Sequence, residues 1–145
     1  MKYVSTGASA TLPQLAVAEF VAKGHFERHL RAVSRQYQRQ RDIMISWVQR
    51  YFPKGSGISY PQGGFLLWVE LPADVDCVRL NERLAQHAIH VAPGALFSAS
   101  GKFRQCLRLN YAFTLTPAME EAVRTVGELA REMLSEVRES SLAMK

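Results

Sequence analysis

Residues 105–111 read QCLRLNY, and their alternation of apolar and polar side chains predicts a β-strand with two different faces. Successive side chains of a strand point to opposite sides. Leu107, Leu109 and Tyr111 therefore share one face, whereas Arg108 lies on the other. The first face is apolar and is expected to pack in the core. Arg108 is predicted to point away from the core, toward water, a partner surface or an anionic ligand.

The composition indicates a folded, globular chain. It has 145 residues, of which 48% are hydrophobic, and this is enough to bury a core. The formal net charge of +5 is compatible with a nucleic-acid partner, but arginine is also common on helix surfaces and in subunit contacts. Cys77 and Cys106 lack the spacing of a metal site and are predicted to be small buried residues in a reducing compartment.

The sequence has no pattern that is typical of a membrane protein. The first residues lack the continuous apolar run of a signal peptide, and no stretch approaches the roughly 20 apolar residues of a membrane span. We therefore predict a cytoplasmic location and no membrane partner.

Two helices are predicted in the first third of the chain. Thr11 followed by Leu-Pro-Gln is a capping-box pattern that opens a helix through about Lys23, and Gly24 ends it. This helix is apolar almost all round, so it is expected to need cover on more than one side. A longer helix is predicted from about Phe26 to Tyr51, because apolar residues recur there at alternating three- and four-residue steps.

Five arginines form a basic ridge on this second helix. They are Arg28, Arg31, Arg35, Arg39 and Arg41. The ridge fits a solvated or intersubunit face better than a DNA contact, because no helix-turn-helix or similar module accompanies it. A nucleic-acid-binding module that uses the basic helix 28–41 is the alternative interpretation.

The chain changes character at residues 53–57, where we predict the main domain boundary between residues 1–52 and residues 53–145. The second part is predicted to contain strand 58–60, strand 65–71, helix 76–88, strand 89–92, strand 106–112 and a terminal helix from Pro117. The helical spacing of the terminal helix predicts a buried stripe of Met119, Val123, Val126, Ala130, Met133 and Val137. The predicted fold class is therefore α/β of the α+β kind. It is a short, mainly antiparallel sheet covered by helices and preceded by a two-helix arm.

No group of residues in the sequence forms a pattern that indicates catalysis. No acid–base pair, phosphate-binding loop or metal cluster emerges, and His25 and His29 share a helical spacing without a third ligand nearby. Lys102 lies in a loop of small residues that gives no reason for its amine to lose its proton. We therefore predict no catalytic, cofactor-binding or metal-binding residue. Gly63 and Gly64 precede a strand, where a turn needs positive φ or another group approaches the backbone closely.

Three stretches in a fixed order resemble one known family. They are YPQGGFLLWVELP at residues 60–72, HVAPGALF at residues 90–97 and CLRLNYA at residues 106–112, before a long terminal helix. This succession resembles the carboxyl-terminal part of fold-type-I aminotransferases, which depend on pyridoxal phosphate. The segment LPQLAVAEFVAKGHFERHLRAVSRQYQRQRDIM at residues 12–44 resembles the MocR type in particular. These GntR-family transcription regulators join a winged-helix DNA-binding domain to an aminotransferase-like domain.

The resemblance implies a role for Arg108. In such enzymes the arginine of this strand binds the α-carboxylate of the substrate, so Arg108 would bind the carboxylate of an amino acid-like ligand. The resemblance also implies that Gly63, Gly64 and Phe65 lie near the mouth of the active site. From the residues alone, a structural salt bridge of Arg108 is the alternative.

The resemblance further implies what the parent protein contains. The family's Schiff-base lysine, the aspartate that pairs with the pyridine nitrogen and the phosphate-binding residues belong to a large domain upstream of Met1, as does the winged helix. This chain is therefore expected to be a fragment that binds no pyridoxal phosphate by itself and is catalytically inactive, because covalent catalysis needs the lysine. The parent is expected to be a homodimer that contacts DNA only through the absent amino-terminal domain. It would either transaminate an amino compound or sense it.

A stand-alone protein-interaction module is the other alternative. An apolar helix without cover would dock on a partner or on a second copy of the chain. Strict monomer behaviour in sedimentation would count against this interpretation.

Overall fold

The structure is a computed structural model that describes residues 11–143. Within this range it contains four α-helices, one short 3-10 helix and four β-strands. The chain divides after Gln36 into two compact units, and each is described by itself. The predicted domain boundary after residue 52 is a different division and stays a prediction.

The first unit consists of α1 (Thr11–Ala22) and the beginning of α2 (His25–Tyr51). Gly24 separates the two helices with a φ of +68°, a conformation that costs glycine little because it has no Cβ. The predicted first helix and its end are confirmed. None of the residues of α1 is buried, and its large apolar side chains are 42% to 81% exposed. The residues that the structure describes therefore leave this helix without the expected cover.

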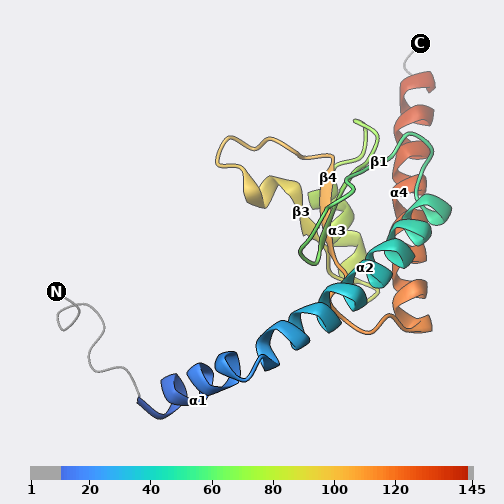
Figure 1. Cartoon of the computed structure of the whole chain (residues 1–145). Helices are drawn as coiled ribbons and strands as arrows, with labels where there is room; N and C mark the ends of the chain where they lie inside the picture. The colour runs from blue at the N-terminus through green and yellow to red at the C-terminus, as the bar shows by residue number, and fades with distance from the viewer. Residues whose placement is uncertain (1–10, 144–145) are drawn as a thin grey trace. The chain divides into compact units, whose positions relative to one another are not determined.

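The second unit contains a four-stranded antiparallel sheet (Figure 1). Its strands are β1 (Gly57–Ile58), β2 (Leu66–Glu70), β3 (Ala92–Pro93) and β4 (Cys106–Asn110). They lie in the order β1-β2-β4-β3, and every neighbouring pair is antiparallel. The predicted short antiparallel sheet is confirmed, and β4 is one of its central strands.

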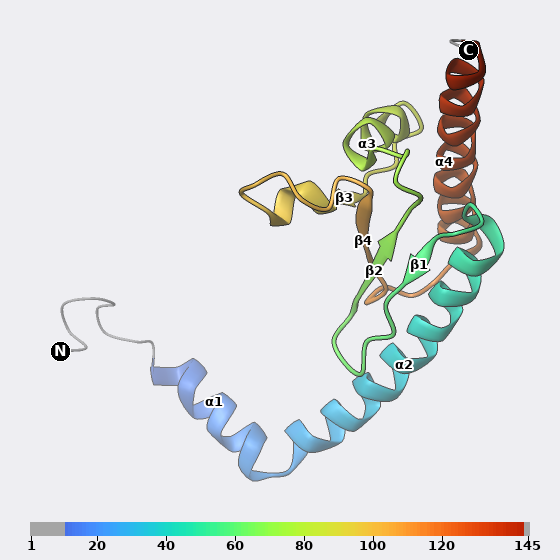
Figure 2. The same ribbon diagram turned by 90° about the horizontal axis from the view of Figure 1, so that it is seen from above.

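Three helices pack with the inward face of this sheet in one buried core. They are residues 37–51 of α2, α3 (Cys77–Ala85) and α4 (Pro117–Ala143). Figures 1 and 2 both show α4 beside the end of α2. The core side chains of these helices include Met44, Val48, Leu80, Leu84, Val123, Val126 and Ala130. The predicted fold class, a mixed α/β arrangement with helices over a short sheet, is confirmed.

β3 begins later than predicted. The predicted strand spans residues 89–92, but pairing with β4 begins at Ala92. The N–H of Val91 donates to the side-chain oxygen of Asn81 at 2.9 Å, and the N–H of Ile89 donates to a carbonyl near the end of α3. The backbone before Ala92 thus completes the end of α3 and does not join the sheet.

The buried stripe of α4 is shorter than the helix. The predicted stripe runs from Met119 to Val137, but Leu134 is the last residue of α4 in the core, and Val137 is 41% exposed. The helix continues past the residues that it packs against. No helix between residues 11 and 143 has the length and apolar content needed to cross a membrane.

Candidate functional site

Arg108 lies in the middle of β4, on the face of the sheet opposite the core. Its neighbours Leu107 and Leu109 are 0% and 8% exposed, whereas Arg108 is half-buried. The predicted alternation is therefore confirmed. Trp68 of β2 and Ala92 of β3 are directly opposite Arg108 in the two adjacent strands. The sheet thus holds the arginine between one large and one small side chain.

The guanidinium of Arg108 has an aromatic partner and no acidic one among residues 11–143. Its Cζ atom lies 4.3 Å from the centre of the Phe97 ring. The ion pairs within this range involve other cations. The arginines that donate side-chain hydrogen bonds there are Arg41, Arg83, Arg104, Arg124 and Arg131. The described residues therefore provide neither a salt bridge nor another acceptor for Arg108.

Three aromatic rings on this face of the sheet form what we call the aromatic platform: Trp68, Phe97 and Phe103. The centre of the Trp68 ring lies 6.0 Å from that of Phe97 and 5.7 Å from that of Phe103. Both pairs meet edge to face, at 65° and 88°. Edge-to-face pairs of this kind contribute roughly 0.5–1.5 kcal/mol beyond the area that they bury. The ring beneath the Arg108 guanidinium is thus itself held by Trp68.

The segment that carries Phe97 is fixed by close backbone packing. Phe97 is the last residue of the 3-10 helix η1 (Gly94–Phe97). A Cβ atom on buried Gly94 would lie 2.5 Å from the carbonyl oxygen of Phe103 and 2.8 Å from the Cβ of Cys106, so only glycine fits there. The Pro93-Gly94 step is therefore the place where η1 docks against the start of β4.

A cavity of about 440 Å³ lies beside the same arginine. Its polar lining consists of His90, Arg108 and Asn110. Its apolar lining comes mainly from α2, α4, the strands and the segment before β3: Met44, Leu66, Ile89, Val91, Ala92, Leu109, Phe113, Met119, Ala122, Val123 and Val126. This combination suits a small molecule with one anionic group and an apolar portion.

The paired glycines lie at the start of β2, away from Arg108 along the sheet. Gly64 has a φ of +79°, and a Cβ atom on Gly63 or Gly64 would meet nothing within 4 Å. Of the two expected reasons for glycine, the positive φ therefore applies to Gly64. The carbonyl of Phe65 accepts a hydrogen bond of 2.9 Å from the N–H of Tyr111. Tyr111 is three residues beyond Arg108, and a strand rises about 3.3 Å per residue, so the turn lies about 10 Å from the arginine. That these residues line the mouth of a site stays a prediction.

The two cysteines are buried, as predicted, and are poor nucleophiles. Burial raises the pKa of the Cys77 thiol to about 12, and burial also raises the pKa of Cys106. Both thiols therefore stay protonated near neutral pH. Among residues 11–143, no group of three His, Cys, Asp or Glu side chains is placed to hold a metal ion.

Local partners account for two of the five arginines in the basic ridge. The Nη1 atom of Arg41 donates to the carbonyl of Pro61 at 3.0 Å, and the same guanidinium pairs with Asp42. In the first unit, Arg31 pairs with Glu27 at 3.7 Å. These two arginines need no nucleic acid to explain them.

The motifs of the sequence indicate Arg108 but not the aromatic residues around it. The step Pro93-Gly94, followed three residues later by Phe97, is the one local sequence feature that points to the aromatic platform. The contact between Phe97 and Arg108 depends on how η1 docks against β4, and this docking cannot be predicted from a short motif.

Comparison with known proteins identifies the family of this fold. The family model described as aminotransferase class I and II matches residues 1–126. The chain belongs to this family. The predicted resemblance to aminotransferases is therefore confirmed.

Two kinds of curated proteins resemble this aminotransferase-family chain. The uncharacterized HTH-type transcriptional regulator YjiR of Escherichia coli is 44% identical over 128 residues, which cover 88% of this chain and 27% of that protein. The 2-aminoadipate transaminase of Thermus thermophilus is 32% identical over 124 residues, which cover 86% of this chain and 31% of that protein. The chain thus spans less than a third of the length of these relatives.

Solved aminotransferase structures share the fold. LysN, an α-aminoadipate aminotransferase from Thermus thermophilus complexed with N-(5'-phosphopyridoxyl)-L-leucine, aligns with a TM-score of 0.80 at 29% identity, over 92% of this chain and 34% of that chain. A multiple substrate aminotransferase from Thermococcus profundus aligns with a TM-score of 0.74 at 25% identity, over 81% of this chain and 29% of that chain. The aminotransferase fold that the motifs imply is confirmed.

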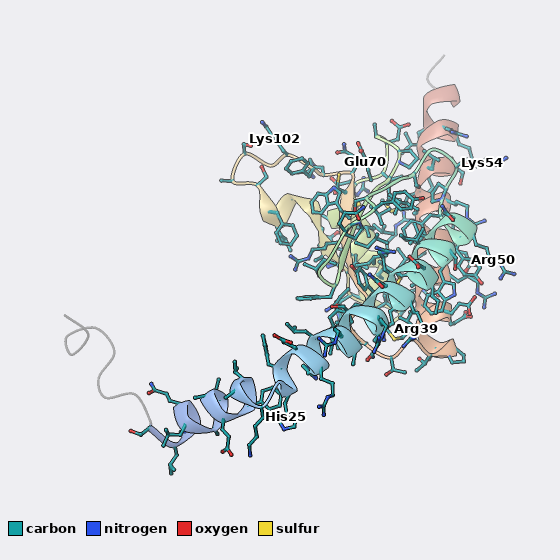
Figure 3. The ribbon with its side chains drawn as sticks, in the orientation of Figure 1. His25, Arg39, Arg50, Lys54, Glu70 and Lys102 are labelled. Atoms are coloured by element: carbon teal, nitrogen blue, oxygen red, sulfur yellow. The ribbon has the colours of Figure 1, made fainter. Side chains whose placement is uncertain are left out.

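The residues that the structure describes do not fit pyridoxal phosphate by themselves. A lysine that binds this cofactor covalently needs an enclosed site in which its amine can lose a proton. Lys23, Lys54 and Lys102 are all exposed, and Lys23 pairs with Glu19 at 2.6 Å. Figure 3 shows Lys102 at the outer end of the loop after η1 and Lys54 at the turn after α2. A lysine that binds this cofactor covalently would therefore have to lie outside the residues that the structure describes.

Proposed function

We propose that this chain is part of the aminotransferase-like effector domain of a MocR-type regulator of the GntR family. In this proposal, Arg108 binds the carboxylate of an amino acid-like ligand. The observation that carries it is that Arg108 is half-buried, is among the residues that line a cavity with mainly apolar walls, and has no acceptor for its guanidinium among residues 11–143. Membership of the aminotransferase family and the similarity to an HTH-type regulator support the proposal.

A guanidinium in this position suits a carboxylate. Its planar fork donates two parallel N–H bonds to two oxygens, and charge-assisted bonds of this kind contribute roughly 1.5–3 kcal/mol each in a shielded site. Ala92, which lies directly opposite Arg108 on β3 and also lines the cavity, would contact the carbon skeleton of the ligand. The turn at residues 63–65 would lie at the mouth of the site. The positive charge of Arg108 therefore favours an anionic ligand, and the volume of the cavity favours a small one.

The remaining functions are proposed for the parent protein. Because the chain covers 27% of the similar regulator, we place the pyridoxal phosphate site in a large domain and the DNA contact in a winged helix, both outside this chain. The parent would be a cytoplasmic homodimer that transaminates or senses an amino compound. The chain by itself would be inactive, since the described residues offer no enclosed lysine.

A carboxylate and its neutral amide test the role of Arg108. The full isotope-labelled chain is titrated with propionate, and the Nε–H resonance of Arg108 is followed by NMR. We expect this resonance to shift with propionate and not with propionamide, which has the same shape and no charge. Arg108→Gln should weaken binding at least tenfold, equivalent to about 1.4 kcal/mol. Arg79→Gln, which changes an exposed arginine of α3, is the matched control.

Two outcomes would contradict the proposal. Propionate binding that survives Arg108→Gln would show that another group holds the carboxylate. A chain that ignores propionate but binds a short DNA duplex, with an affinity that falls steeply as salt is added, would favour the nucleic-acid alternative on residues 28–41.

A further inference from the structure

We propose that Phe97 is a positioning residue that fixes the plane of the Arg108 guanidinium for a two-pronged contact with a carboxylate, while Trp68 and Phe103 hold Phe97 in place. This inference rests on the proposed function of Arg108. It adds to that site a residue that acts through the arginine and need not touch the ligand.

The ring of Phe97 supports the guanidinium of Arg108 from one side. The Cζ atom of Arg108 lies over the Phe97 ring, 4.3 Å from its centre. A guanidinium at this distance is attracted to the negative face of the ring. Contact through the flat side of the guanidinium leaves the N–H groups at its edge free to donate. A carboxylate would approach in the guanidinium plane, and Phe97 sets that plane.

No hydrogen bond or ion pair among residues 11–143 orders the side chain of Arg108. No ion pair in this range includes Arg108. Ala92, directly opposite on β3, is too short to restrain a long side chain. An unrestrained arginine samples several rotamers, and the loss of this freedom on binding lowers affinity. The contact with Phe97 orders the arginine before the ligand arrives, so less freedom is lost.

Phe97 is itself held in place by its neighbours. Its ring meets Trp68 edge to face at 6.0 Å, and Trp68 meets Phe103 in the same way at 5.7 Å. Gly94 packs so closely against the backbone of Phe103 that a Cβ atom would not fit, and this contact anchors η1. Phe97 is nevertheless 45% exposed, so a change of its side chain does not open the core.

The test compares the wild-type chain with three variants, each with and without propionate. In the wild-type chain without ligand, the ring current of Phe97 should shift the Hδ protons of Arg108 upfield in the NMR spectrum. Phe97→Leu keeps an apolar side chain but removes the ring, so it should abolish this shift and weaken propionate binding about two- to fivefold, the range expected for a partly exposed cation–π contact. Phe97→Tyr keeps the ring and should behave like the wild-type chain. Leu96→Ala, at a neighbouring position that is 74% exposed, is the control for changes in η1.

The possible failures are distinguishable. A wild-type chain without the upfield shift would overturn the inference whatever its ligand binding. If the wild-type chain and Phe97→Leu bind propionate equally while Arg108→Gln does not bind it, the inference fails and the proposed function of Arg108 stands. A wild-type chain that shows the shift and binds no propionate would overturn both, since Phe97 would then have no carboxylate contact to prepare.

Discussion

The backbone of α4 at Gly127 lies directly against the end of α2 at Tyr51. Gly127 is buried, and a Cβ atom on it would lie 2.7 Å from the carbonyl carbon of Tyr51 and still closer to the carbonyl oxygen. The Tyr51 hydroxyl also donates a hydrogen bond of 2.7 Å to Glu120 of α4. The missing side chain at Gly127 is thus what lets the two helices come this close.

Gly127→Ala is expected to destabilise the chain by about 1–3 kcal/mol, the usual cost of overpacking. A backbone carbonyl cannot move aside as a flexible side chain can, so this cost should exceed the gain of about 0.5–1 kcal/mol that alanine brings to a helix. Urea unfolding followed by circular dichroism measures the difference. Glu128→Ala changes the next, exposed residue and should stay within about 0.5 kcal/mol of the wild-type chain. Equal or greater stability of Gly127→Ala would contradict the close contact.

Asp76 links the start of α3 to the segment before β4 through one carboxylate. Its side chain accepts from the N–H of Val78 at 2.8 Å and from the Nε of Arg104 at 3.0 Å. Burial alone would raise the pKa of Asp76. The hydrogen bonds from Arg104 and the backbone outweigh burial, so the pKa of Asp76 lies below its ordinary value of 3.8.

The stability that Asp76 contributes is therefore expected to depend on pH. Because the folded-state pKa is lower than the unfolded value, this contribution is fully present above about pH 4 and is lost as the pH falls through the folded-state pKa. Asp76→Ala should lower the free energy of unfolding by about 1–2 kcal/mol near pH 7. Urea unfolding at a series of pH values should show this difference shrinking toward acid, whereas Asp74→Ala, in the exposed turn before α3, should change little. A difference that does not vary with pH would contradict the assigned role.

The long helices and the strand of Arg108 can be predicted from the sequence because their patterns are local. Alternation over a few residues is enough to place Leu107 and Leu109 inside and Arg108 outside. The three- and four-residue spacing of α4 is enough to predict that Val123 and Val126 are buried. A spacing cannot show where the neighbours of a helix end, and for this reason the prediction that Val137 belongs to the buried stripe is wrong.

The features that could not be predicted depend on contacts between distant parts of the chain. The late start of β3 follows from a hydrogen bond between Asn81 and the backbone of Val91. The stacking of Phe97 on Arg108 requires both the docking of η1 and the outward direction of the arginine. Each of these contacts joins residues that no short motif contains. Local patterns are therefore enough to predict that Arg108 points away from the core, but not that the Phe97 ring lies against its guanidinium.

The surface of α1 predicts that the chain associates with itself. Its residues are not buried, and Leu12, Leu15 and Val17 are 81%, 61% and 62% exposed. Burial of a leucine side chain stabilises by roughly 1.5–3 kcal/mol, so water disfavours this surface. We expect sedimentation velocity to show concentration-dependent association of the full chain, as the proposed homodimer requires. Leu15→Glu should weaken this association at least tenfold, because a charge would have to be buried with it.

Glu19→Gln provides the matched control for this experiment. It changes one exposed polar side chain of α1 and leaves the apolar residues in place, so association should stay close to that of the wild-type chain. A wild-type chain that remains a monomer at every concentration would contradict self-association through α1. Association that is equally strong in Leu15→Glu would instead assign the contact to another surface, because the buried charge at position 15 would then cost nothing.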